Sequence, residues 1–157
     1  MSMEPHFDIT ITRTIAAPRR TLFLAWLSPP ALRQFMCPAP GVTLAEVAVD
    51  PRVGGTFNIV MQVGDKRLPH RGEYTVIERY ERLSFTWRSA SAGQESQVTL
   101  TFAEVSAEKT ALTLQHVGLP HRVARDNHER GWTRIVQLLE SAELLAGPHV
   151  DRQEKSA

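Results

Sequence analysis

The stretch that decides the fold is Asp126-Asn-His-Glu-Arg-Gly-Trp-Thr-Arg-Ile-Val-Gln-Leu-Leu-Glu-Ser-Ala-Glu-Leu-Leu145. Its apolar residues recur at the helical period, and they are Trp132, Ile135, Leu138, Leu139, Ala142 and Leu145. Asp126 and Glu129 have the spacing of a capping box at the start, and Gly147-Pro148 stops the pattern. The sequence therefore predicts one amphipathic helix of about five turns, the longest element of the chain.

Upstream of this helix, residues 42–117 have the pattern of antiparallel strands separated by turn signals such as Gly64-Asp65. One face of the expected sheet is apolar, and its members are Phe57, Ile59, Met61, Val63, Gly72, Tyr74, Val76, Leu83, Phe85, Trp87, Val98, Leu100, Phe102, Leu112, Leu114 and His116. The opposite face carries Glu73, Arg88 and several threonines, so we expect it to be solvated. The apolar face must be covered, and only the terminal helix is long enough to cover it.

The N-terminal part of the chain adds one strand and two short helices. Residues 7–15 alternate strictly between apolar and polar side chains, which is typical of a half-buried strand. Pro18 stands where a first short helix would begin. Ser28 is a candidate N-cap for a second short helix that has Pro29 at its first position.

These elements predict an α+β protein with the helix-grip arrangement, in which a curved antiparallel sheet wraps around a long C-terminal helix. The two short helices follow the first strand and close one end. We expect a flexible N-terminus at residues 1–6, a single domain at residues 7–147 and a flexible polar tail at residues 148–157.

Composition narrows the class of protein further. The chain has 157 residues, and its 18 basic and 17 acidic side chains give a formal net charge of +1. We therefore expect no nucleic-acid partner, because a basic footprint is missing. No apolar run of about 18 residues occurs, which argues against membrane insertion. The single cysteine, Cys37, fits a reducing compartment, and we expect a cytoplasmic protein.

Packing of a helix on a sheet often leaves a pocket between them, and small-molecule sites occur at such places. The candidate cavity-lining residues are Trp26, Phe35, Met36, Phe57, Ile59, Met61, His70, Tyr74, Phe85, Trp87, Leu100, Phe102, Leu114, His116, His128, Trp132, Ile135 and Leu139. Taken singly, most of these would serve equally well as core side chains. As a set, they bring several polar groups inward and favour a ligand pocket with a few polar contacts.

Three histidines in this set are the chemically informative members. His116 lies on the apolar face, and a buried imidazole needs a polar partner, which can be a core atom, a water or a ligand. His70 belongs to the same face but follows Pro69 near a strand end, where water can reach it. His128 precedes Trp132 by four residues in the expected first helical turn, so it faces either the pocket mouth or solvent.

Motifs for catalysis or metal binding are not supported. In His128-Glu-Arg-Gly-Trp132 the position of the second histidine of a zinc-protease motif is a tryptophan. Cys37 follows the expected end of a helix, whereas thiolates are activated at helix N-termini or beside cations. We assign no catalytic residue and expect no metal and no cofactor.

Several strings resemble the START-like (Bet v 1-like, SRPBCC) superfamily and, within it, the family named for the activator of heat-shock protein 90 ATPase homologue. They cover roughly residues 7–146 and comprise Arg13-Thr-Ile-Ala-Ala-Pro18, Phe23, Ala25-Trp26, Asp50-Pro-Arg-Val-Gly-Gly55, Gly72-Glu-Tyr74, Glu81-Arg-Leu-Ser-Phe-Thr-Trp87, Glu95 to Phe102 and Glu129-Arg-Gly-Trp132. The resemblance implies a helix-grip fold with an internal hydrophobic cavity. It also implies a link to chaperones and the stress response.

Three functions follow as hypotheses. The first is binding of a small hydrophobic molecule, lipid-like or aromatic and polyketide-like, in the cavity. The second is a cofactor-free cyclase or hydrolase in the same cavity, with His116 or His70 as acid or base, although the sequence favours a binding protein over an enzyme. The third is a chaperone-interacting module resembling the heat-shock protein 90 ATPase activators. A homodimer partner is a further alternative that the sequence leaves open.

Overall fold

The computed structural model describes residues 7–142, apart from the side chains of residues 94 and 95. Its elements in chain order are β1 (Ile9–Ile15), α1 (Arg19–Ala25), α2 (Pro29–Phe35), β2 (Thr43–Val49), β3 (Thr56–Val63), β4 (Lys66–Glu78), β5 (Arg82–Ser89), β6 (Gly93–Ser106), β7 (Lys109–Val117) and α3 (Arg122–Ser141). The expected order of elements is confirmed. The expected flexible ends, residue Leu145 and the stop at Gly147-Pro148 lie outside the described residues.

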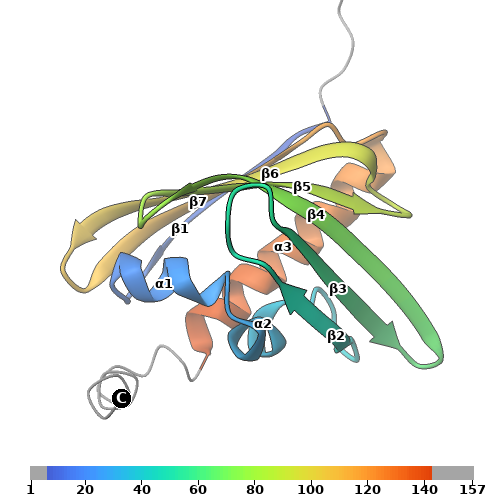
Figure 1. The fold of residues 1–157 in the computed structure, drawn as a ribbon, viewed down its shortest axis with the longest axis horizontal. Coiled ribbons are helices and arrows are strands. Elements are labelled where there is room, and N and C mark those ends of the chain that lie inside the picture. The colour runs from blue at the N-terminus through green and yellow to red at the C-terminus, as the bar shows by residue number, and fades with distance from the viewer. Residues whose placement is uncertain (1–6, 143–157) are drawn as a thin grey trace, which may run out of the picture.

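The seven strands form one antiparallel sheet in the order β1-β7-β6-β5-β4-β3-β2. Five of the six pairings join consecutive strands, as short hairpin connections favour. The sixth joins β1 to β7, and there Ile9 lies opposite His116. The sheet curves over α3, and α1 and α2 lie on the same side as α3 (Figure 1), which confirms the helix-grip arrangement.

Local sequence explains the two short helices. The hydroxyl of Ser28 accepts a hydrogen bond from the Ala31 backbone N–H at 3.4 Å, with Pro29 at the first helical position. Both helices bury their apolar side chains, including Phe23 in α1 and Phe35 in α2, each of which is fully buried. Trp26, the residue that follows α1, contacts Phe35 of α2 edge-to-face and Trp132 of α3 with tilted rings. The two short helices therefore extend the aromatic core between α3 and the sheet.

The start of α3 differs from the expectation. The helix begins at Arg122, four residues before Asp126, and its N-cap is His121, whose Nδ1 accepts a hydrogen bond from the Ala124 N–H at 3.1 Å. Asp126 therefore lies inside the helix and pairs with Arg125 instead of capping. Histidine is not among the usual N-cap residues, which is why the capping-box spacing was the stronger sequence signal.

The apolar face of the sheet also departs from strict alternation in β4. A register shift between Tyr74 and Val76 inserts one extra residue against β5, so Val76 pairs with Ser84 and Ile77 with Leu83. The residue that packs against the core after the bulge is Ile77. Val63, at the end of β3, is 39% exposed, because it precedes the Gly64-Asp65 turn of a hairpin.

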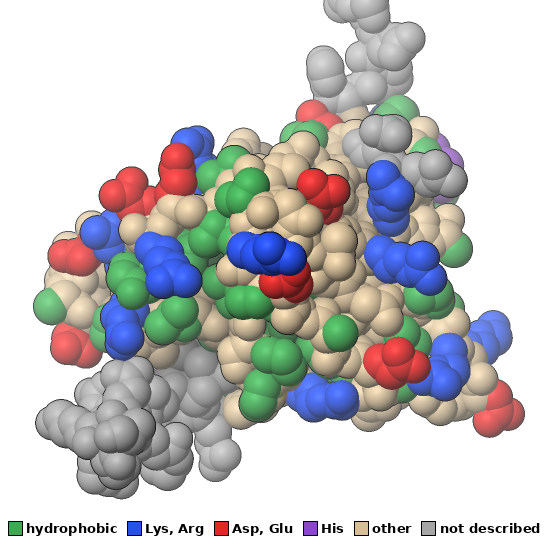
Figure 2. Space-filling model, in the orientation of Figure 1, with side chains coloured by type: hydrophobic (Ala, Val, Ile, Leu, Met, Phe, Trp, Pro, Cys, Tyr) green, Lys and Arg blue, Asp and Glu red, His purple; other side chains and the backbone are tan. Residues whose placement is uncertain are grey.

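Charges of both signs are spread over the face of the molecule seen in Figure 2.

Candidate functional site

A pocket of about 190 Å³ lies between α3 and the strands that face it. The strands contribute Met61, Leu68, His70 and Trp87, whereas α3 contributes Asn127, His128, Gly131, Trp132 and Ile135. Ser91 from the β5–β6 turn and Pro38 from the loop after α2 complete the wall. Among the side chains that the structure describes, none of those lining the pocket is Asp, Glu, Lys or Arg.

A second void, nearer α2, measures about 10 Å³. It is bordered by Trp26, Leu32, Met36, Phe57, Ile59, Tyr74, Phe85 and Trp87. A cavity of this size is at the lower limit for a single water molecule. The aromatic side chains around this void therefore act as packed core. A further hollow, of about 510 Å³, is lined by residues of β3, β4 and β5 and by none of α3, namely Thr56, Phe57, Asn58, Arg71, Gly72, Glu73, Thr86 and Arg88.

The structure divides the candidate cavity-lining residues into three groups. At the pocket between α3 and the sheet lie Met61, His70, Trp87, His128, Trp132 and Ile135. Around the small void lie Trp26, Met36, Phe57, Ile59, Tyr74 and Phe85, and Trp87 borders both spaces. Phe35, Leu100, Phe102, Leu114, His116 and Leu139 are buried and border neither space.

Five wall residues carried no sequence signal. They are Pro38, Leu68, Ser91, Asn127 and Gly131. Pro38 and Ser91 lie in loops, and Leu68 lies near the turn between β3 and β4. Asn127 lies in the turn that the sequence predicts as the first of the helix. Gly131 is the exception with a physical role, because a β-carbon there would stand 3.0 Å from the Cβ of Pro38. Glycine at this position allows the loop and the helix to approach each other closely.

Beside the pocket is a compact group of rings that we call the His–Trp cluster, made of His70, Trp87, His116, His128 and Trp132. All of them except His116 line the pocket. The ring centroids of Trp87 lie 5.1 Å from those of both His70 and Trp132. The rings of His116 and His128 meet edge-to-face at 5.3 Å. Residues from β4, β5, β7 and α3 thus meet at one place, which only the folded sheet brings about.

His116 is fully buried, and its tautomer follows from its partner. The indole N–H of Trp132 donates to His116 Nδ1 at 2.9 Å, so Nδ1 carries the lone pair. Burial, reinforced by the neighbouring His128, lowers the pKa of His116 to about 3. The ring is therefore neutral at pH 7 with its proton on Nε2. This N–H has no hydrogen-bond partner within the described part of the chain.

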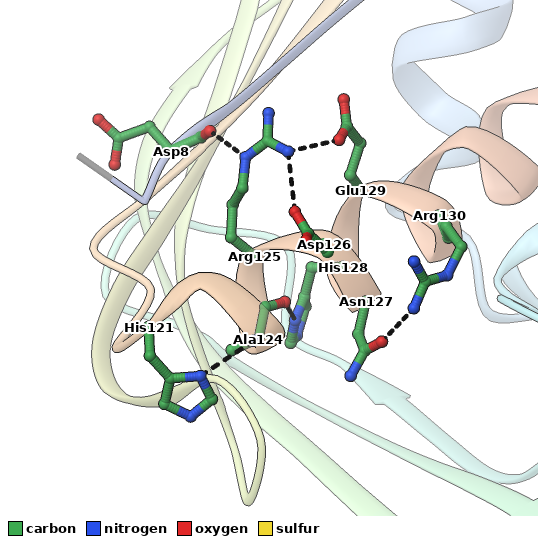
Figure 3. Close-up of polar contacts among 9 residues, drawn as sticks. All are labelled: Asp8, His121, Ala124, Arg125, Asp126, Asn127, His128, Glu129 and Arg130. Carbon is green, nitrogen blue, oxygen red and sulfur yellow. Dashed lines mark hydrogen bonds and ion pairs between the residues drawn. The ribbon is translucent and has the colours of Figure 1, made fainter. Parts of the chain in front are cut away.

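His128 and His70 are also neutral at pH 7. His128 Nδ1 lies 2.8 Å from the carbonyl oxygen of Ala124, to which it donates (Figure 3), leaving Nε2 as an acceptor. Burial lowers the pKa of His128, and the backbone bond to Ala124 opposes that shift. Burial also lowers the pKa of His70 to about 4. The pocket wall is consequently uncharged at physiological pH.

A network of charged side chains fixes the N-terminal half of α3 (Figure 3). The Arg125 guanidinium donates to the backbone oxygen of Asp8, just before β1, at 3.1 Å. The same guanidinium pairs with Asp126 at 3.1 Å and with Glu129 at 2.6 Å. This arrangement links the first turns of α3 to the start of β1, an edge strand of the sheet.

Cys37, the single cysteine, does not line the pocket. Burial raises the pKa of the Cys37 thiol, against the opposing effect of Arg134, so the thiol is protonated at pH 7. Within residues 7–142, no group of three or more His, Cys, Asp or Glu side chains is placed to hold a metal ion. None of the helices in that range is long and apolar enough to cross a membrane.

The fold and the position of the pocket define a helix-grip protein, and comparison with known proteins identifies its family. Residues 16–142 match the family described as Activator of Hsp90 ATPase homolog 1-like protein. The chain belongs to this family, which is consistent with the START-like superfamily. None of the curated proteins matches the chain.

Solved structures agree with this assignment. A protein from Chromobacterium violaceum is 26% identical, with a TM-score of 0.79 over 88% of this chain and 97% of that one. The AHSA1 protein from Silicibacter pomeroyi is also 26% identical, with a TM-score of 0.73 over 85% and 95%. An HSP90 activator from Plasmodium falciparum, 22% identical, shares the fold with a TM-score of 0.68 over 85% and 94%.

Proposed function

We propose that this protein binds a small hydrophobic molecule in the pocket between α3 and the sheet. The observation that carries the proposal is an uncharged pocket of about 190 Å³ whose wall is mainly apolar and aromatic. Ligand sites are concave, mostly apolar and equipped with a few polar groups that fix orientation. The neutral imidazoles of His70 and His128 supply such groups here.

Thermal-shift and native mass-spectrometry measurements across a library of small hydrophobic molecules test this proposal. We expect at least one class of compound to raise the melting temperature and to add its mass to the folded protein. The variant Gly131→Ala adds a methyl group between α3 and Pro38, at the pocket wall. The methyl group occupies space at the wall that a ligand would fill, so we expect binding to weaken, by about tenfold for each 1.4 kcal/mol of interaction lost.

The matched control is Gln137→Ala, an exposed position on the same helix, which should leave binding unchanged. Ala in place of Gly raises helix propensity, so Gly131→Ala is expected to remain folded. A library in which no compound shifts either readout would overturn the proposal. Equal binding by both variants would place any ligand outside this pocket.

A second candidate function is interaction with a chaperone of the Hsp90 class. Two observations favour it, namely the family description and the name of the Plasmodium falciparum protein as an HSP90 activator. Adding the purified protein to a purified Hsp90 should then raise the rate of ATP hydrolysis. If the contact surface lies outside the pocket, the Gly131→Ala variant should do so equally. An unchanged rate over a concentration series up to saturation would reject this candidate.

A further inference from the structure

The hollow formed by β3, β4 and β5 lies on the face of the sheet that points away from α3. Of its lining residues, Glu73 precedes the core residue Tyr74, and Arg88 follows the core residue Trp87. Because successive side chains of a strand point to opposite faces, these charged residues lie on the outer face. The hollow measures about 510 Å³, and ligand sites occupy about 300–1,000 Å³. It is large enough for a small molecule.

Two arginines on this face stand next to each other. Arg71 and Arg88 are directly opposite in the β4–β5 ladder. Like charges in such a pair destabilise a sheet, because the two Cβ atoms are only about 4.5–5.5 Å apart. Within the described part of the chain, neither guanidinium forms an ion pair or a hydrogen bond. By contrast Arg67, on the same face of β4, pairs with Glu46 at 2.8 Å. The Arg71–Arg88 pair therefore lacks the counter-charge that Arg67 has.

A hydroxyl group adds a third donor. The backbone N–H of Glu73 donates to Thr86 Oγ1 at 2.9 Å. A hydroxyl that accepts one hydrogen bond keeps its own proton to donate, so Thr86 can give that proton to a molecule in the hollow. Asn58 lies across from Arg71 on β3, but its Oδ1 atom is buried and does not reach the hollow. The accessible polar groups beside the arginines are thus mainly donors.

The charges of the hollow favour one kind of anion. Its described charged side chains are Arg71, Arg88 and Glu73, so two positive charges and one negative charge leave a net charge of +1. A carboxylate, with a single negative charge, balances this exactly once. A phosphate monoester carries about −1.5 to −2 at pH 7 and would also be repelled by Glu73. Guanidinium groups bind carboxylates through two parallel N–H···O bonds.

We propose that this hollow binds the carboxylate group of a small organic acid, held by the guanidinium groups of Arg71 and Arg88 with the Thr86 hydroxyl as a third donor. The body of the acid fills the remaining volume. This second site is independent of the pocket between α3 and the sheet. The uncharged wall of that pocket disfavours a carboxylate, because the anion would lose its hydration without gaining an opposite charge.

NMR titrations at low ionic strength with benzoate, benzamide and inorganic phosphate test the proposal. Benzoate should shift the backbone amide resonances of Arg71, Glu73 and Thr86. Benzamide has the same shape without the charge, so it should bind there roughly tenfold more weakly, because hydrogen bonds between ions are the stronger ones. Added salt should weaken benzoate binding, since the arginines are exposed. Equal affinity for benzamide, tighter binding of phosphate, or unmoved β4 and β5 resonances would overturn the proposal.

Variants locate the site. Arg71→Gln and Arg88→Gln should each weaken benzoate binding about tenfold, while the melting temperature stays unchanged or rises because the like-charge repulsion is relieved. Arg67→Gln is the matched control, since it removes a positive charge from the same face of the same strand, and it should keep the wild-type affinity. An equal loss in Arg67→Gln would mean that benzoate senses only the overall charge, which would overturn the proposal. Gly131→Ala should bind benzoate normally, so failure here leaves the proposed function untouched.

One acidic residue of the neighbouring strand needs its own variant. Glu95 belongs to β6, which pairs with β5, and its side chain is outside the described ones. Glu95→Gln should bind benzoate as the wild-type protein does. A tenfold gain in affinity would show that the chain itself supplies the counter-charge to the arginines, and the proposal would then fail for the native protein.

Discussion

At the scale of single residues, the bond between Trp132 and His116 determines the chemistry of the cluster. It fixes the His116 tautomer, holds the Trp132 ring against Trp87 and joins α3 to β7 through the core. Both partners are buried, with His116 at 0% and Trp132 at 2% exposure. A hydrogen bond in such surroundings is costly to break, because the remaining partner stays buried and unsatisfied.

Replacing Trp132 with Phe tests this bond. The change leaves His116 Nδ1 without a donor, and we expect the free energy of unfolding to fall by about 1–3 kcal/mol beyond the effect of the smaller ring. Trp26→Phe is the reference, because it makes the same change in a core ring whose N–H bonds to nothing among the described residues. Urea unfolding of both variants measures the difference. Equal losses in the two variants would mean that the bond contributes nothing to stability.

At the scale of elements, the start of α3 shows that the residue that caps a helix can differ from the one that a capping-box spacing predicts. The helix starts where His121 can cap it, and the pair Asp126 and Glu129 instead serves Arg125 on the helix surface. This earlier start moves His128 from the expected first turn to the second, where it donates to Ala124 and contacts His116. His128 therefore lies within a regular helical turn, on the same side of α3 as Trp132, and both residues line the pocket.

His121→Ala should lower the free energy of unfolding by about 1 kcal/mol, which is the usual effect of losing an N-cap acceptor. Asp126→Ala is the comparison, because Asp126 would be the cap if the helix began where the spacing suggests. Its ion pair is exposed, so we expect an unchanged unfolding midpoint. Denaturant titrations of the two variants give the answer, and a larger loss from Asp126→Ala would contradict the observed helix start.

At the scale of the whole molecule, the buried histidines make the fold sensitive to acid. The pKa of His116 is about 3 in the folded protein and about 6.5 when unfolded. Between these values the unfolded chain binds a proton that the folded protein does not, so stability is fully present above pH 6.5 and is lost as the pH falls below it. His70, with a folded pKa of about 4, acts in the same direction.

Unfolding midpoints measured at pH 7 and pH 5 should show this dependence. From the His116 shift alone we expect a loss of about 2 kcal/mol over that interval. His116→Gln retains an acceptor for Trp132 but does not titrate, so its loss should be smaller by about the same amount, whatever its stability at pH 7. An identical loss in both proteins would show that His116 is not the group responsible.

The sequence by itself determined the order of elements, the apolar face of the sheet and the buried side of the last helix. Each of these depends on local periodicity or on a local signal such as Ser28 before Pro29. The family resemblance was equally readable, because its strings are spread along the matched residues 16–142. Local rules failed where one extra residue entered the strand after Tyr74, since no glycine or proline marks that bulge.

Only the tertiary structure decided the pairing of β1 with β7, the helix start at His121 and the division of the aromatic residues between packed core and open pocket. The pocket wall joins Pro38, Leu68, Ser91 and Gly131, which are far apart in the chain. Their approach depends on how strongly the sheet curves and how closely α3 crosses it. Those distances result from packing of the whole core, and no local pattern of residues encodes them.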